Sequence, residues 1–102
     1  GFVMQRGTTP TLSFAIPIDT SLLDAVWVTL SQNDTEIVTK TMSECEMDGN
    51  IIRAKLTQAD TLRLSTDYDT EIQLRVRTKD GTVPETKIFK ERTERVLKPE
   101  VI

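Results

Sequence analysis

Apolar and polar residues alternate through most of this chain, which is the pattern of strands that bury one face. In the first such segment Leu12, Phe14 and Ile16 are separated by single residues, so an extended chain places all three on one side. The same period of two recurs later. We predict further strands at residues 26–31, 36–42, a segment that ends near Met47, and residues 51–56, 71–78 and 86–90.

Short turn signals separate these segments. Asp48-Gly49 and Asp80-Gly81 each lie between two predicted strands, and Asp-Gly favours a type I′ hairpin turn because that turn needs positive φ at both central residues. We therefore predict hairpins at these two positions. A further short turn, Gln32-Asn33-Asp34, separates two earlier strands, and Pro17 followed by Asp19 ends the first strand.

One stretch, residues 57–62, breaks the alternation. Thr57 precedes Asp60 by three positions, which is the spacing of a capping box, in which each side chain accepts a hydrogen bond from the other residue's backbone N–H. We predict a single helical turn there, bridging two strands.

These elements predict an all-β fold: an antiparallel immunoglobulin-like β-sandwich of six to seven strands with one short helical turn. A length of 102 residues, of which 37% are hydrophobic, suits one domain with one core. We assign residues 4–102 to this domain. Gly1, Phe2 and Val3 precede Met4, and we interpret them as a remnant of cloning or an extended start.

Composition removes several kinds of chemistry. The chain has no histidine and one cysteine, Cys45, which excludes Ser-His and Cys-His nucleophile pairs, an internal disulfide and most zinc sites. Its 13 Lys and Arg and 16 Asp and Glu are interspersed, without the dense basic stripe of a nucleic-acid binder. No apolar run approaches a membrane span, and no secretion leader is visible. We expect no enzymatic activity, no cofactor, and neither nucleic acid nor membrane as partner.

Two aromatic residues are candidates for a protein interface. If Val26, Val28 and Leu30 face the core, strict alternation turns Trp27 outward, and Phe89 is outward if Ile88 is inside. Outward aromatic side chains are typical contact anchors. The alternative is that a bulge or the edge of the second sheet covers Trp27 within the monomer.

Charged positions add a second set of interface candidates. Arg75 and Arg77, with Lys79, share one face of their predicted strand; the alternative is that this face is simply solvated. The first 50 residues carry two basic and seven acidic side chains, and the remaining 52 carry eleven and nine. This asymmetry could orient identical subunits head to tail, with the acidic segment 44–48 of one facing basic groups of the next. We further hypothesise that Val101 and Ile102 dock the end of the chain onto another subunit.

Other residues favour structural roles. Asp67, Asp69 and Glu71 have the alternate spacing of a calcium loop, but the glycine and the final glutamate of such a loop are missing, so we predict no metal site. Tyr68 resembles the tyrosine corner of sandwich domains. Cys45 lies between Glu44 and Glu46, whose charges disfavour a thiolate, so we expect an inert side chain.

Several segments also carry a family resemblance. Residues 6–14, Pro17-Ile18-Asp19 and residues 26–32 look like the opening of short proteins encoded in phages and prophages of low-GC Gram-positive bacteria. The likeness continues through residues 48–50, 56–62, 72–76 and 80–81, and so covers most of the chain from Met4. The layout is also similar to the N-terminal domain of phage baseplate upper proteins, a small β-sandwich used for assembly.

The resemblance implies a virion or prophage component that binds other protein subunits and has no catalytic residues to carry over. The expected role is a tail, baseplate or head-tail component that forms a homo-oligomer or joins other phage structural proteins, first in the host bacterial cytoplasm and then in the virion. The alternative is a carbohydrate-binding or adhesion module, in which Trp27 with Tyr68 or Phe89 would stack on a sugar. An enzyme is the third possibility, disfavoured because no nucleophile-base or phosphate-binding motif is present.

Overall fold

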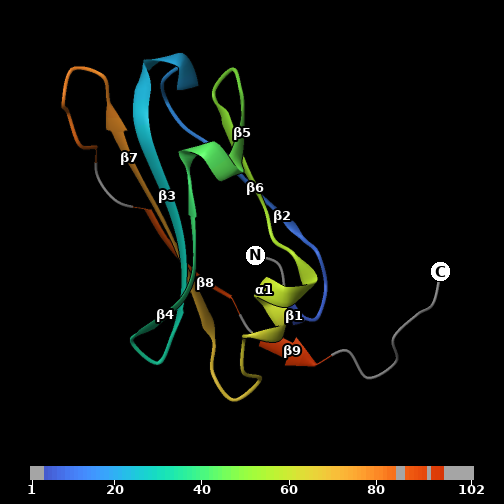
Figure 1. The fold of residues 1–102 in the computed structure, drawn as a ribbon. Helices are drawn as coiled ribbons and strands as arrows, with labels where there is room; N and C mark the ends of the chain where they lie inside the picture. Colours follow the sequence, from blue (N-terminus) through green and yellow to red (C-terminus); the bar gives the residue numbers. More distant parts are fainter. Residues whose placement is uncertain (1–3, 85–86, 92, 96–102) are drawn as a thin grey trace.

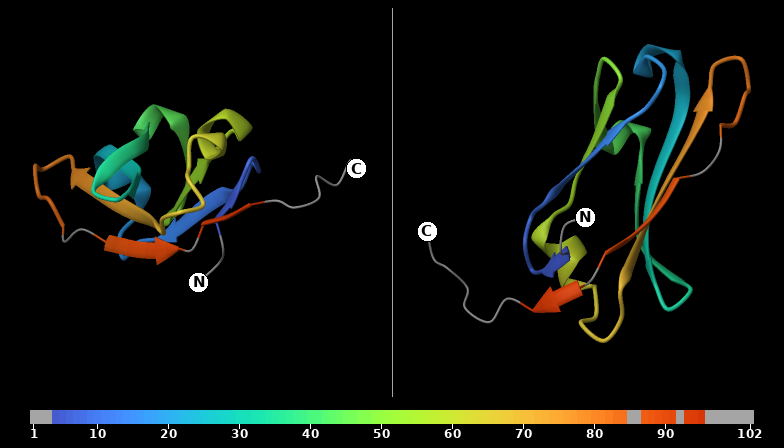
Figure 2. Two further views of the ribbon diagram at one scale, coloured as in Figure 1. Left: turned by 90° about the horizontal axis from the view of Figure 1, so that it is seen from below. Right: turned by 180° about the vertical axis from the view of Figure 1, so that it is seen from behind.

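A computed structural model describes residues 4–84, 87–91 and 93–95, with side chains placed for residues 4–84. Two sheets lie face to face (Figures 1 and 2), which confirms the predicted all-β sandwich. The three-stranded sheet has the order β2 (Thr11–Ala15), β6 (Ile51–Lys55), β5 (Cys45–Asp48). The four-stranded sheet has the order β4 (Thr35–Thr41), β3 (Leu23–Gln32), β7 (Thr70–Thr78), β8 (Lys87–Glu91).

Neighbouring strands within each of these two sheets pair antiparallel. Because β2 lies beside β6 and β3 beside β7, the chain crosses repeatedly between the sheets, as it does in immunoglobulin-like sandwiches. A short parallel pair, β1 (Met4–Arg6) and β9 (Thr93–Arg95), was not predicted. Each of its strands has three residues, too few to produce a periodic pattern in the sequence.

The core fills the space between the two sheets. Leu12 and Phe14 on β2, predicted to share one face, are 3% and 8% exposed and pack there with the inward residues of β3, β6 and β7. Burial alternates regularly along β2 and β7, as half-buried strands require. The alternation in the sequence therefore correctly predicts which residues of β2 and β7 face the core.

The turns confirm the predicted strand connections and correct their geometry. Asp48-Gly49 links β5 to β6, and Asp80-Gly81 lies between β7 and β8, but of these four residues only the glycines have positive φ, so neither turn is type I′. The type I′ pattern occurs at Asn33 and Asp34, whose φ values are 50° and 59° and which form the two-residue loop between β3 and β4. Asp80 instead accepts hydrogen bonds from the Thr78 hydroxyl and the Thr82 N–H, which fix the turn through its side chain.

The predicted helical turn is present as α1 (Gln58–Leu62). The Asp60 N–H donates to Thr57 Oγ1 at 3.0 Å and the Thr57 N–H donates to Asp60 Oδ2 at 2.8 Å, which confirms the capping box. Two 3₁₀ turns, η1 (Thr20–Leu22) and η2 (Met42–Glu44), complete the elements in the described part of the chain.

Gln32, the last residue of β3, is a buried polar side chain. Its Nε2 donates to the carbonyl of Ser65 at 2.8 Å, and its Oε1 accepts from the Ser65 N–H at 2.8 Å. Nε2 also lies 3.2 Å from the carbonyl of Tyr68. These bonds tie β3 to the loop before β7, where the sequence suggested a tyrosine corner at Tyr68. The Tyr68 side chain is 47% exposed and makes no such bond within the described residues.

Candidate protein interface

Trp27 lies in the middle of β3, a central strand paired with β4 on one side and β7 on the other. Val26, Val28 and Leu30 are at most 1% exposed and face the core, whereas the half-buried Trp27 points to the outer face of the four-stranded sheet. The orientation expected from strict alternation is therefore observed. Side chains of the neighbouring strand β7, and not the second sheet, lie over the Trp27 ring.

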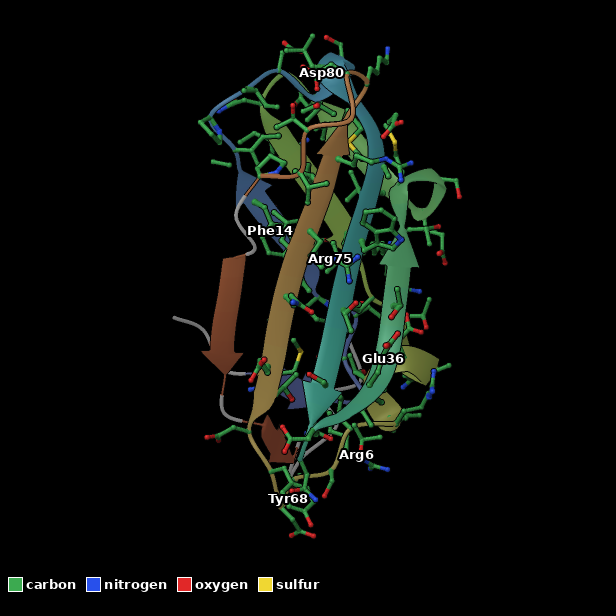
Figure 3. All side chains as sticks on the ribbon, turned by 90° about the vertical axis from the view of Figure 1, so that its left-hand side faces the viewer. Arg6, Phe14, Glu36, Tyr68, Arg75 and Asp80 are labelled. Atoms are coloured by element: carbon green, nitrogen blue, oxygen red, sulfur yellow. The ribbon has the colours of Figure 1, made fainter. Side chains whose placement is uncertain are left out.

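Two arginines of β7 lie against the Trp27 ring. Arg75 is paired with Trp27 in the sheet register, and its Cζ lies 5.0 Å from the ring centroid. Arg77 is two residues further along β7, and its Cζ lies 5.8 Å from the same centroid. Both distances fall within the range of a cation–π interaction. Three of the interface candidates thus form one cluster, and Figure 3 shows Arg75 at the centre of the outer face.

The two arginines differ in their charge partners. Arg77 Nε donates to Asp24 Oδ1 at 2.8 Å, in an ion pair between half-exposed side chains. Arg75 is exposed and has no carboxylate partner among the described residues, where the Trp27 ring is the group that its guanidinium contacts. Asp24 was not singled out from the sequence, because the register shift between Leu23 and Ala25 interrupts the alternation at that position.

Uncharged polar side chains surround this cluster. Thr41 is paired with Trp27, and Thr29 lies between Thr39 and Gln73, with its hydroxyl 3.3 Å from that of Thr39. We call the outward residues of this surface the Trp27 face: Trp27, Thr29, Thr41, Gln73, Arg75 and Arg77. A sheet face that combines a large aromatic ring with guanidinium groups has two of the residue types that are enriched in protein interfaces.

The remaining interface candidates lie beyond the described side chains. Phe89 belongs to β8, where its backbone is paired with Ile72, and the structure places no side chain for it. Val101 and Ile102 lie outside the described residues altogether. Their proposed contacts stay predictions.

The acidic loop before β7 borders a hollow of about 230 Å³ at the end of the sandwich opposite Asp80 (Figure 3). The hollow is lined by Ser31, Asn33, Asp34, Tyr68, Asp69 and Glu71. Within residues 4–84, 87–91 and 93–95, no three carboxylate or thiol side chains come together in a way that could hold a metal ion. The same ranges contain no helix long and apolar enough to cross a membrane.

The acidic segment at β5 is held mainly by charges of its own sheet. Arg53 Nη1 lies 3.1 Å from Asp48 Oδ2 and 3.6 Å from Glu46 Oε1. Burial raises the pKa of the half-buried Cys45 thiol, and the neighbouring Glu44 carboxylate raises it further. Cys45 is thus disfavoured as a thiolate, as the sequence predicted.

No protein-family model matches the chain, and neither a curated protein nor a solved structure matches it.

Proposed function

We propose that this chain is a non-enzymatic structural or assembly protein of a phage or prophage particle, a tail, baseplate or head-tail component, and that it acts through protein contacts at the Trp27 face. The observation that carries the proposal is the stacking of Arg75 and Arg77 on Trp27 in the middle of an exposed sheet. The sequence resemblance to short phage proteins supplies the biological setting.

The chemistry of the Trp27 face supports a protein partner. Trp and Arg, with Tyr, are enriched among the residues that dominate the energy of protein interfaces, and such residues tend to cluster. Arg75 has no carboxylate partner among the described residues, so the partner that fits best presents a carboxylate beside an apolar surface. That carboxylate would bind the guanidinium while the apolar surface covers the ring.

A non-enzymatic role is supported by the side chains available for proton transfer. The chain has no histidine, and the pKa of its one cysteine is raised. General acid-base or nucleophilic catalysis at neutral pH needs groups whose pKa values lie near the working pH. The carbohydrate-binding alternative needs an aromatic ring open for stacking, whereas two guanidinium groups lie within 6 Å of the Trp27 centroid.

The test is reconstitution with the particle proteins. The chain is co-expressed with the structural proteins encoded beside it, and complexes are measured by size-exclusion chromatography with light scattering. Trp27→Ala and Arg75→Ala should each weaken the complex, Trp27→Ala more strongly. Lys55→Ala is the matched control for Arg75→Ala, because it removes one exposed positive charge from the opposite sheet.

Two results would overturn the proposal: a complex that neither substitution at the Trp27 face weakens, or no complex with any of the particle proteins. A glycan array provides the test of the alternative. Glycan binding that Trp27→Ala abolishes would favour the carbohydrate-binding function.

A further inference from the structure

The three-stranded sheet ends in β2, which is bonded to β6 on one side only. Figures 1 and 2 show β2 as the outermost strand of this sheet. Its outward residues Thr11, Ser13 and Ala15 are exposed, while Leu12 and Phe14 point into the core. We call Thr11, Ser13 and Ala15 the β2 edge.

The register with β6 shows which backbone groups of β2 are unused. On either side of β2, the Ile16 N–H donates to the Asn50 carbonyl at 2.9 Å and the Leu56 N–H donates to the Pro10 carbonyl at 2.9 Å. Because the register between these two bonds is regular, the even-numbered residues of β2 exchange hydrogen bonds with β6. In an antiparallel pair the residues between them direct both N–H and C=O away from the partner. The backbone groups of the β2 edge therefore point outward, and β6 is the only strand bonded to β2 in the described part of the chain.

Two other edge strands, β5 and β4, carry features that hinder pairing with another chain. On β5, Glu46 and Asp48 are exposed carboxylates in a strand of four residues. On β4, the register shifts opposite Leu30, and Lys40 is paired with the buried Val28 and so points inward. Bulges, short length and charges, inward charges above all, are the usual protections of sheet edges. β2 is also short, with five residues, but its sequence, Thr-Leu-Ser-Phe-Ala, carries no charge and its pairing with β6 has no register shift.

We infer that the β2 edges of two copies of this chain pair antiparallel. The two-fold axis that relates the copies passes between their two Ser13 residues. In this register Ser13 faces Ser13 of the other copy, and Thr11 faces Ala15 of the other copy. All of these are residues whose N–H and C=O point outward, so each facing pair exchanges two hydrogen bonds. The two three-stranded sheets become one continuous sheet.

The side chains of β2 agree with this pairing. On the inner side Leu12 would face Phe14 of the other copy, which extends the apolar layer across the axis. On the outer side only hydroxyls and a methyl group meet, so no like charges oppose each other. A self-paired β5 would instead bring Glu46 and Asp48 of two copies together. Pro10 and Pro17 bound the strand and keep the interface small, so we expect a dimer that forms and dissociates with concentration.

The test uses charges placed at the axis. Because Ser13 faces its own copy, Ser13→Lys and Ser13→Glu should each abolish dimerisation, while an equimolar mixture of the two variants should form a dimer again. The mass of the unmodified chain, of each variant and of the mixture is measured by analytical ultracentrifugation over a hundredfold concentration range. Gln58→Lys, which adds the same charge on the exposed side of α1, should dimerise like the unmodified chain.

Circular dichroism and thermal unfolding show whether each variant is folded. Ser13→Pro is a second variant, because it removes the central N–H, which the monomer does not use, without adding charge. A chain that stays monomeric at every concentration overturns the inference, and so does a dimer that Ser13→Lys leaves intact. This inference does not depend on the proposed function: self-association is read in the absence of any particle protein, and the Trp27 face lies on the other sheet.

Discussion

The outer faces of the two sheets use arginine in different ways. On the three-stranded sheet Arg53 of β6 lies between two carboxylates of β5, Asp48 at 3.1 Å and Glu46 at 3.6 Å. On the four-stranded sheet Arg75 lies over Trp27 at 5.0 Å and has no carboxylate partner among the described residues. Both arginines come from strands whose sequences alternate in the same way.

This difference separates an ordinary solvated face from a candidate contact face. The charges around Arg53 compensate one another, so a partner that covered them would have to remove water from groups that are already satisfied. Arg75 stacks on an aromatic ring, is less strongly hydrated than an ammonium group, and keeps its hydrogen-bond donors available. A partner that supplies a carboxylate can therefore form a new ion pair with Arg75, whereas Arg53 already has carboxylate partners.

Trp27→Ala should produce the largest effect. It removes both cation–π contacts and the half-buried ring from a central strand, which should lower the free energy of unfolding by about 2 kcal/mol. Affinity for the particle partner should fall by about 30-fold or more, as expected for an interface hot spot. Urea denaturation and a binding titration measure the two quantities. A variant as stable and as tightly bound as the unmodified chain would remove the distinction between the two faces.

Arg75→Ala should have an intermediate effect. It removes one exposed cation–π contact and leaves the Arg77 pair with Asp24 in place, so stability should fall by about 0.5–1 kcal/mol. Partner affinity should fall more than stability, because the Arg75 guanidinium, which has no carboxylate partner among the described residues, is the group that the partner binds. Urea denaturation and the same titration check this, and equal affinity for Arg75→Ala and the unmodified chain would contradict it.

Arg53→Ala should have little effect, within about 0.5 kcal/mol, because exposed ion pairs contribute little to stability. Partner affinity should not change. This variant is compared with Arg75→Ala under identical conditions. If Arg53→Ala weakens the complex as much as Arg75→Ala does, the three-stranded sheet belongs to the interface and the comparison fails.

The turn between β7 and β8 should contribute a pH-dependent part of the stability. Asp80 accepts hydrogen bonds from the Thr78 hydroxyl and the Thr82 N–H, which lower its pKa from 3.8 to about 2. Because the pKa is lower in the folded state, the ionised carboxylate stabilises the fold above pH 3.8, and this contribution is lost as the pH falls toward 2. Asp80→Asn should remove that part of the pH dependence. Thermal unfolding between pH 2 and 6 measures it, and identical profiles for both proteins would refute the expectation.

Much of the fold could be predicted from the sequence, because a strand that buries one face shows it in its own residues. The capping box of Thr57 and Asp60 is similarly local. The Trp27 cluster could be predicted only in part. Alternation indicates that Trp27 and Arg75 both point outward, but their contact depends on the register between β3 and β7, which no local pattern specifies.

Other features depend entirely on tertiary context. Gln32 has the appearance of a turn residue in the sequence, and its buried role depends on Ser65 and Tyr68, more than 30 positions away. The parallel pairing of β1 with β9 joins the two ends of the described chain. The sequence predicted type I′ turns at the two Asp-Gly pairs, but the positive φ values that define this turn occur at Asn33 and Asp34. Several residue pairs can adopt one turn type, so the pair alone does not specify it.

The most direct test of the central claim uses the single tryptophan of the chain, Trp27. Incorporation of 5-fluorotryptophan gives one ¹⁹F resonance, which reports on the Trp27 face alone. We predict that this resonance shifts or broadens when the unlabelled particle proteins are added, and that Arg75→Ala suppresses the change. A resonance that stays the same while the complex forms would contradict the claim that the Trp27 face is the contact surface.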